Sequence, residues 1–187
     1  MPHKFDPANI EVLLGSDRLK ELNPTQFLIE NGLKKGMRFA DIGCGPGFFS
    51  IPAAEIVGER GIIYAVDTQD EMLKELLKRR PPKNVKTIKS NENHIPLDSG
   101  SADFVLLAFV LHEAEDRPAF LSEVKRLLKT DGSLLLLEWE KITEDKGPPF
   151  EERIAKNDTK IVIEKAGFKI QEIANQNPSQ YRIKAVK

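Results

Sequence analysis

The run from Phe39 to Phe49, Phe-Ala-Asp-Ile-Gly-Cys-Gly-Pro-Gly-Phe-Phe, is the feature that most constrains how this chain folds. Its apolar start is typical of a buried strand, its glycines of a tight turn, and the residues after them of a helix. Glycines at positions 43, 45 and 47 allow positive φ and let a ligand approach without meeting a Cβ atom. Such a turn at the carboxyl end of a parallel strand is where open α/β sheets bind nucleotide-like ligands. The sequence therefore predicts a ligand site at this turn.

Strand-like and helix-like segments alternate over most of the chain. We expect helices near residues 24–31, 48–57, 68–80, 116–129 and 158–166, and strands near 37–42, 61–66, 85–89, 103–110 and 133–139. This alternation is typical of a parallel, doubly wound α/β sheet with helices on both faces. Residues 168–174 and 181–186 resemble two strands without a helix between them, so they must pair antiparallel. The prediction is a mostly parallel seven-stranded sheet with an antiparallel C-terminal hairpin.

Length and composition set further limits. The 187 residues contain no linker-like segment, so we expect one domain over 1–187. The chain has 28 Lys and Arg and 29 Asp and Glu, and its net charge of -1 gives no general attraction to nucleic acid or to an anionic membrane. The longest apolar run, 104–111, is too short to span a bilayer, and no apolar signal region opens the chain. The single cysteine excludes a disulfide and a multi-cysteine zinc site, so no metal is predicted and a cytoplasmic location is expected.

Four motifs, taken together, resemble the class I S-adenosylmethionine (SAM) dependent methyltransferases. The resemblance is specific over residues 35–139 and looser over the tail, where only the order of elements matches. In the family the glycine turn passes under the methionine part of SAM, and the leading acidic residue bonds it, often through the ammonium or a water. The resemblance implies a Rossmann-like fold, SAM as cofactor and S-adenosylhomocysteine (SAH) as product. The cofactor-binding candidates from this first motif are Asp41, Gly43, Cys44, Gly45 and Gly47.

The second motif is Asp67, which ends a predicted strand about 20 residues after the glycine turn, the spacing at which a carboxylate holds ribose hydroxyls. A carboxylate can accept two hydroxyl protons at once. The competing interpretation is an N-cap for the helix that begins near Gln69, a role open also to Thr68 or Asp70. We include Thr68 with Asp67 among the cofactor-binding candidates. The resemblance also implies that Met72 packs against the adenine, with ordinary helix core as the alternative.

The third motif is the polar segment 91–97, Asn-Glu-Asn-His-Ile-Pro-Leu. In the family an acidic residue or an amide here bonds the adenine amino group, and the next main-chain N–H bonds a ring nitrogen. Asn91 or Glu92 would take the first role and Glu92 the second. The commoner family residue is Asp, and Asn91 departs from it while keeping an acceptor oxygen.

The fourth motif is the end of the apolar strand, residues 107–113. In the family the carbonyl near Ala108 accepts from the SAM ammonium, and Phe109 and His112 then lie near the methyl group. Methyl transfer from a sulfonium is an in-line displacement, which needs a base only where the acceptor holds a proton. His112 is the best-placed base and Glu138 the second, although a lone histidine is more often structural.

Two further segments are expected to shape the site. Residues 1–33 form a helical arm ahead of the core at 34–187, either a lid that excludes water or an arm packed behind the sheet. Residues 141–153, which contain Gly-Pro-Pro-Phe, are expected to form a loop that shapes the acceptor pocket and offers a surface for a homodimer.

A small-molecule acceptor, methylated on oxygen, nitrogen or carbon, is the expected partner. Cys44 lies inside the cofactor turn, which leaves no thiolate for cytosine or arsenic chemistry. The Asn/Asp-Pro-Pro-aromatic motif of enzymes that methylate amino groups of planar bases is missing, as is an RNA-binding module. The alternatives are a SAM-binding regulatory or partner subunit, a methyltransferase acting on protein or RNA, and a nicotinamide oxidoreductase, which would usually show G-x-G-x-x-G.

Overall fold

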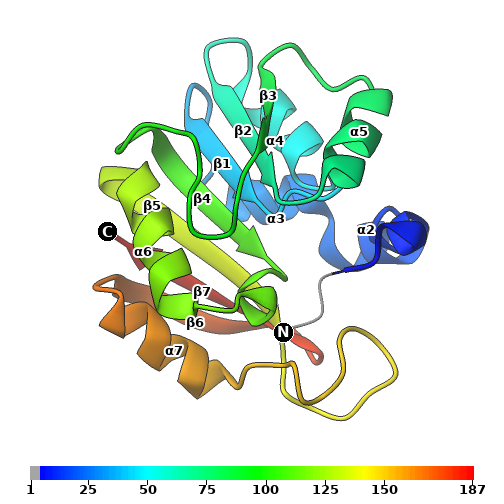
Figure 1. Cartoon of the computed structure of the whole chain (residues 1–187), viewed down its shortest axis with the longest axis vertical. Coiled ribbons are helices and arrows are strands. Elements are labelled where there is room, and N and C mark those ends of the chain that lie inside the picture. Colours follow the sequence, from blue (N-terminus) through cyan, green and yellow to red (C-terminus); the bar gives the residue numbers. More distant parts are fainter. Residues whose placement is uncertain (1–4) are drawn as a thin grey trace.

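Seven strands form one sheet in the structure, a computed structural model that describes residues 5–187 (Figure 1). The strands are β1 (Arg38–Ile42), β2 (Ile62–Asp67), β3 (Val85–Lys89), β4 (Ala102–Ala108), β5 (Leu128–Trp139), β6 (Lys169–Asn177) and β7 (Gln180–Val186). Their order in the sheet is β3-β2-β1-β4-β5-β7-β6. Strands β1 to β5 pair in parallel, whereas β7 is antiparallel to both β5 and β6. The predicted mixed sheet and its C-terminal hairpin are confirmed.

Helices cover both faces of this sheet, as predicted (Figure 1). The helical elements are η1 (Pro7–Asn9), α1 (Ile10–Leu13), α2 (Ser16–Leu22), α3 (Pro24–Glu30), α4 (Ser50–Val57), α5 (Asp70–Lys78), η2 (Leu111–Glu113), α6 (Arg117–Leu127) and α7 (Lys156–Lys165). Helices α4 and α5 contact β2 and β3, while α6 contacts β5 and α7 contacts β6.

Alternate strand positions pack into two apolar cores, one on each face. Phe39 and Phe104, whose ring centroids are 5.6 Å apart, join the core that contains α3 and α4. Ala40 and Val105, one position further along, join the core that contains α6, because successive strand residues point to opposite faces. Helix α3 belongs to this packing, since Phe27 is buried within it. The part of the arm outside the cores is therefore η1, α1 and the start of α2, whose last residue, Leu22, joins the same core as Phe27. Residues 1–4 of the predicted arm lie outside the described residues.

The main differences from the prediction concern two strand boundaries and one helix cap. Strand β5 begins at Leu128 rather than at 133, because a shift of register beside β4 lets the chain keep pairing. Strand β4 ends at Ala108, because Phe109 takes a left-handed conformation with φ 60°. The expected cap of α5 by Thr68 or Asp70 is wrong: the structure shows no capping bond from the N-cap side chain, and the carboxylate of Asp67 accepts the Gln69 N–H instead.

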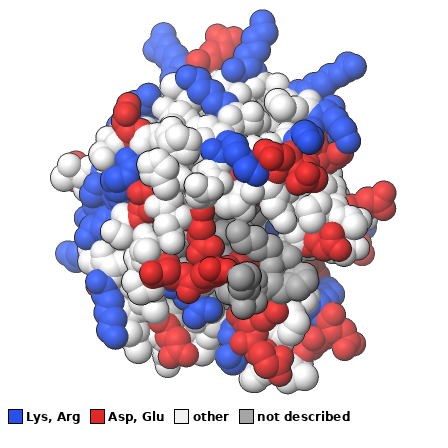
Figure 2. Space-filling view, in the orientation of Figure 1, with Lys and Arg blue, Asp and Glu red and all other residues white. Residues whose placement is uncertain are grey.

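Within residues 5–187, no helix combines the length and the apolar character needed to cross a membrane. Figure 2 shows basic and acidic side chains interspersed over one face of the molecule. That face of the described chain does not present the continuous basic surface that nucleic-acid binding uses.

Candidate active site

A cavity of about 850 Å³ opens at the carboxyl ends of β1, β2 and β4. This volume lies toward the upper end of the roughly 300–1,000 Å³ of small-molecule sites, so it has room for two small molecules side by side. The candidates from the sequence that line it are Asp41, Gly43, Cys44, Gly45, Asp67, Thr68, Met72, Asn91, Glu92, Ala108, Phe109 and His112. Gly47 and Glu138 are not lining residues.

The glycine turn is tied to the end of β2 through its main chain. The N–H groups of Gly43 and Cys44 donate to the Val66 carbonyl at 2.8 and 2.9 Å. Gly43 has φ +72°, and a Cβ atom there would lie 2.3 Å from Val110 Cγ2. At Gly47 a Cβ atom would meet Leu76 at 2.9 Å, so packing against α5 explains this glycine. The turn therefore offers a ligand close approach rather than free N–H donors.

Asp67 holds the glycine turn and the start of α5 together. Its Oδ2 accepts the Gly45 N–H at 2.8 Å, and its Oδ1 accepts the Gln69 N–H at 2.8 Å. Burial raises the pKa of Asp67, although these main-chain bonds act to lower it. Each carboxylate oxygen keeps a second lone pair for a ligand hydroxyl. The capping and ribose interpretations are thus compatible in geometry.

Asp41 is almost fully enclosed at the end of β1. Its Oδ2 accepts the Ser50 hydroxyl at 2.6 Å, which connects the strand to the first residue of α4. Burial is the main cause that raises the pKa of Asp41 to about 7, and the charge of Asp67 adds to it. A buried carboxylate held by one hydroxyl is stabilised when a cationic ligand enters the cavity.

The predicted adenine side lies between α5 and the 91–97 segment. Met72 is buried and lines the cavity from the first turn of α5. Asn91 exchanges two main-chain hydrogen bonds with His94 in a tight turn. The Glu92 carboxylate accepts the Glu115 N–H at 2.7 Å and so connects this turn to the entry of α6. The third motif is therefore a loop at the cavity wall that is held by hydrogen bonds within the turn and to the start of α6.

His112 and Glu138 form a buried pair beside the cavity. The Nδ1 atom of His112 lies 2.9 Å from Glu138 Oε2 and 3.1 Å from Oε1. Glu138 also accepts the main-chain N–H groups of His112 and Trp139, both at 3.2 Å. Burial acts to lower the pKa of His112, but the charge and hydrogen bond of Glu138 outweigh it and raise the pKa. With Nδ1 facing Glu138, the Nε2 atom is the one left for a ligand.

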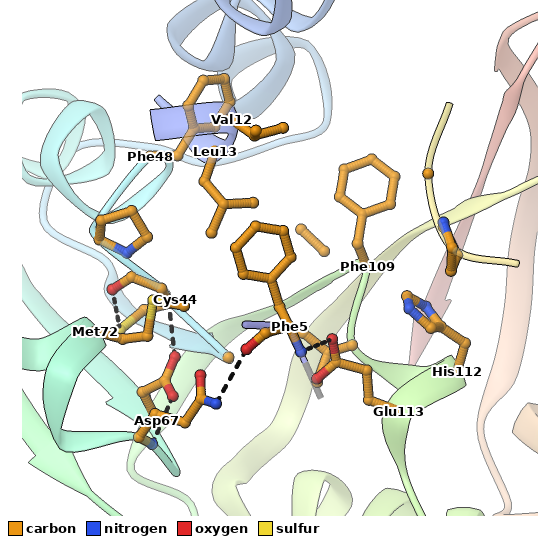
Figure 3. Close-up of a pocket in the computed structure, with 18 of the residues that line it drawn as sticks. Phe5, Val12, Leu13, Cys44, Phe48, Asp67, Met72, Phe109, His112 and Glu113 are labelled. Carbon is orange, nitrogen blue, oxygen red and sulfur yellow. Dashed lines mark hydrogen bonds between the residues drawn. The ribbon is translucent and has the colours of Figure 1, made fainter. Parts of the chain in front are cut away.

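The N-terminal arm crosses the middle of the cavity. Figure 3 shows Phe5 between the side chains of Asp67 and Glu113. The Phe5 N–H donates to Glu113 Oε1 at 3.2 Å, and its carbonyl accepts from Gln69 Nε2 at 3.1 Å. Burial makes the largest contribution to the raised pKa of Glu113, which is about 7. The arm thus bridges the two sides of the site.

An aromatic wall closes the side opposite the glycine turn. The rings of Phe109 and Trp139 lie 5.1 Å apart and are tilted by 37°. Trp139 is pressed against the 140–153 loop, since a Cβ atom at Gly147 would come within 2.7 Å of its ring. The left-handed backbone of Phe109 is uncommon for an aromatic residue and here aims its ring at Trp139.

Arg153 holds that loop in shape and is only 2% exposed. Its Nε donates to the Pro148 carbonyl at 2.9 Å, and its Nη1 donates to the Glu140 carbonyl at 3.1 Å. Nη1 also pairs with Glu144 Oε1 at 2.6 Å, and Nη2 donates to the Lys146 carbonyl. One side chain therefore fixes most of the loop.

Several cavity residues were missed by the sequence reasoning. These are Arg18 from α2, Gln69 just after β2 and Glu113 from η2, whereas Phe5 and Leu13 reach the cavity from the arm that the sequence predicts as a lid. Gln69 lies two residues after Asp67 and Glu113 ends the fourth motif, so their position was a usable signal. The arm residues carry no motif, because their place depends on how a loosely patterned segment folds back.

The cavity fits SAM by the chemistry of the groups that line it. Carboxylates at the ends of β1 and β2 suit a cation and a diol, and the buried Met72 offers an apolar contact for a flat base. Asp41, Asp67 and Met72 would hold the methionine, ribose and adenine parts. SAM would supply there a methyl group activated by a positive sulfur.

Comparison with known proteins identifies the family. The methyltransferase domain model matches residues 40–136. A crystal structure of a SAM-dependent methyltransferase from Aquifex aeolicus has 36% sequence identity and a TM-score of 0.93, covering 98% of this chain and 99% of that one. The ubiquinone/menaquinone biosynthesis C-methyltransferase UbiE of Shewanella piezotolerans is 31% identical over 147 residues, 76% of this chain and 57% of that protein.

The demethylmenaquinone methyltransferase of Geobacillus kaustophilus is 35% identical over 109 residues, 57% of this chain and 47% of that protein. The chain thus spans about half the length of the curated relatives it matches. The family-model match and the Aquifex structure agree with the motifs and the sheet topology. The chain belongs to the class I SAM-dependent methyltransferases.

Proposed function

We propose that this protein methylates a small aromatic acceptor that carries an ionisable hydroxyl group. The observation that carries the proposal is that one cavity joins the glycine turn to His112 and to the aromatic wall of Phe109 and Trp139. The relatives named as a ubiquinone/menaquinone biosynthesis C-methyltransferase and a demethylmenaquinone methyltransferase support an aromatic acceptor. A cytoplasmic location and a homodimer formed through residues 141–153 stay predictions.

His112 is the base in this proposal. With its Nδ1–H donated to Glu138, the Nε2 lone pair takes the acceptor hydroxyl proton, and the resulting imidazolium is stabilised by Glu138. Loss of that proton makes the acceptor oxygen, or an aromatic carbon conjugated with it, nucleophilic. Glu138, predicted as a second base, is instead a positioning residue here, because it is 1% exposed and does not line the cavity.

In this proposal the aromatic wall aligns the acceptor and the arm closes the cavity. Phe109 and Trp139 hold a flat acceptor by stacking, so that alignment rather than further chemistry accelerates transfer. The arm acts as the predicted lid, because Phe5 already bonds both sides of the site and its displacement would open the cavity.

The proposal is tested by incubating the protein with SAM and a panel of catechols, naphthoquinols, aliphatic amines and a peptide mixture, with SAH formation as the readout. We expect turnover with the phenolic compounds. His112→Ala should lower it by about 100- to 10,000-fold, the usual contribution of general acid–base catalysis, while SAM affinity changes less than about threefold. His94→Ala is the matched control, since His94 is exposed and lies off the cavity wall.

The pH profile separates the base from a structural histidine. A base must be neutral, so the rate should rise with pH through the raised pKa of His112. Glu138→Gln removes the charge that raises this pKa, and the profile should shift to lower pH with a lower plateau. Turnover of amines or peptides alone, or an unchanged profile in Glu138→Gln, would contradict the proposal.

A further inference from the structure

Gln180 is a buried amide on the acceptor side that the proposed reaction does not use. It is the first residue of β7 and is 3% exposed. It lines the main cavity and also a neighbouring cavity of about 300 Å³. Trp139 and Lys146 line both cavities as well. Gln180 therefore lies where the two cavities adjoin.

The sheet places Gln180 directly beside the aromatic wall. Strands β4, β5 and β7 are neighbours, and β7 runs antiparallel, so it begins at the edge where β4 and β5 end. Phe109 follows β4, Trp139 ends β5, and Gln180 pairs with Trp139 in the ladder between β5 and β7. A side chain placed by a sheet in this way is well positioned for recognition, because its main chain is fixed by the ladder.

The hydrogen bonds of Asn177 define which end of the Gln180 amide is free. Asn177 Oδ1 accepts the Ser179 N–H at 2.9 Å, so Nδ2 is the end of that amide left to donate. Nδ2 donates to Gln180 Oε1 at 3.0 Å. Among residues 5–187, the Nε2 atom of Gln180 has no hydrogen-bond partner. The two N–H donors of this nitrogen are therefore available to a ligand.

The charges nearby indicate what kind of oxygen suits these donors. Glu21, Asp145 and Glu152 line the main cavity, and the charge of Lys146 is paired with Glu21 at 2.7 Å. A carboxylate ligand would enter an acidic surrounding and be repelled. A neutral ring carbonyl or hydroxyl oxygen accepts the same hydrogen bond without that cost. The site of Gln180 thus favours a neutral oxygen.

We propose that Gln180 is a specificity-determining residue, whose Nε2 donates a hydrogen bond to a second, neutral oxygen on the acceptor ring. The proposal rests on the proposed function and narrows the acceptor to an aromatic compound with two oxygens. His112 takes the proton of one oxygen and Gln180 recognises the other. An acceptor without the second oxygen leaves a buried donor unpaired, which is how such a site rejects it.

The test measures binding to protein saturated with SAH, so that it does not depend on turnover. Dihydroxynaphthalene isomers are compared with naphthols, and hydroxytetralones with hydroxytetralins, which lack the second oxygen. Wild-type protein should bind the best isomer of each pair about 5- to 100-fold more tightly than its counterpart, the range for leaving a buried donor unpaired. The hydroxytetralones matter because their carbonyl oxygen can only accept. No preference for the second oxygen in either pair would overturn the proposal.

Gln180→Leu removes the amide and keeps a side chain of similar size. It should weaken the compounds with two oxygens by the same factor and leave naphthols and hydroxytetralins within about threefold. Gln171→Leu is the matched control, since Gln171 lies in the same hairpin but is exposed and off the cavity wall. Thermal unfolding checks that each variant is folded. Equal weakening of all compounds in Gln180→Leu would show a packing role only and would overturn the proposal.

Asn177→Asp tests the direction of the hydrogen bond. The new carboxylate can still accept the Ser179 N–H, but it cannot donate to Gln180. The Gln180 amide should then turn, donate to that carboxylate and present Oε1 to the cavity. The variant should keep the preference for a second hydroxyl, which can donate, and lose the preference for the tetralone carbonyl. A retained carbonyl preference would overturn the assigned orientation.

The same compounds, assayed with SAM, separate this proposal from the proposed function. Compounds that bind with the expected preference but form no SAH product would refute the proposed reaction and support the role of Gln180. Phenols that are methylated with no preference for a second oxygen would support the reaction and overturn the role of Gln180.

Discussion

The two sides of the cavity are held in different ways. Most of the cofactor side lies within residues 41–72, where main-chain bonds of 2.8 and 2.9 Å and buried carboxylates hold it together. The acceptor side brings together the arm, the end of β5 and the 140–153 loop, and it depends on side-chain bonds. Arg153 holds the loop, and a salt bridge of 2.7 Å between Lys146 and Glu21 connects the loop to α2. The first side is therefore held mainly within one continuous part of the chain, and the second by a few side chains that join distant parts of it.

Breaking the cofactor side should have the largest effect. At Gly43 an alanine would have to keep φ near +72° and place its Cβ against Val110. We expect Gly43→Ala to cost about 2–4 kcal/mol from left-handed strain and overpacking, and SAM affinity to fall about 100-fold or more. Thermal unfolding and SAM titration measure the two effects. Adding Val110→Ala should restore part of the affinity by removing the clash, and an unchanged affinity in the single variant would refute this account of the turn.

Breaking the acceptor side should separate turnover from cofactor binding. Arg153→Met removes the bonds to the 140–153 loop and leaves Glu144 without its ion-pair partner, although the Ser179 hydroxyl still donates to it. We expect phenol turnover to fall about 10- to 100-fold because a misplaced wall spoils alignment, with SAM affinity changed less than about threefold. Arg182→Met is the control, since Arg182 pairs with Glu172 in the C-terminal hairpin. Equal losses in both quantities would show that the two sides are not independent.

The same contrast explains what the sequence could predict. The cofactor side is largely a continuous segment that runs from β1 through the glycine turn and α4 to β2 and α5, so glycine spacing and strand-end carboxylates predicted its location in the cavity. The acceptor side depends on contacts between distant residues, such as Lys146 with Glu21. Nothing local marks these contacts. Glu138 illustrates what sequence patterns cannot predict. Its position at a strand end was predicted, but its burial behind His112 was not.

The raised pKa of Asp41 on the cofactor side predicts that both stability and SAM affinity depend on pH. In the folded protein this pKa is about 7 instead of the ordinary 3.8, so folded protein holds this proton more tightly than unfolded protein. The contribution of Asp41 to stability should therefore fall as pH rises from about 4 to about 7. SAM carries cations, favours the ionised carboxylate and releases the proton. Its affinity should thus rise by up to about tenfold between about pH 6 and pH 8.

Calorimetry in two buffers of different ionisation enthalpy counts the released protons. Asp41→Asn should flatten the pH dependence that comes from this residue, and the rest should disappear in Glu113→Gln, because the pKa of Glu113 is also about 7. 5′-Methylthioadenosine, which lacks the ammonium and the sulfonium charge, should bind independently of pH. A pH-dependent affinity for that ligand would mean that the protons belong to another event.

The salt bridge between Lys146 and Glu21 should give the smallest effect. Both side chains are largely exposed, at 65% and 42%, so water and salt screen their attraction. We expect Glu21→Gln and Lys146→Gln each to raise acceptor KM by less than about threefold, with no further change in the double variant, because either change breaks the same contact. The effect should vanish near about 1 M salt, where the Debye length is about 3 Å. A large or salt-resistant effect would mean that arm and loop form a fixed wall, and the acceptor side would then resemble the cofactor side.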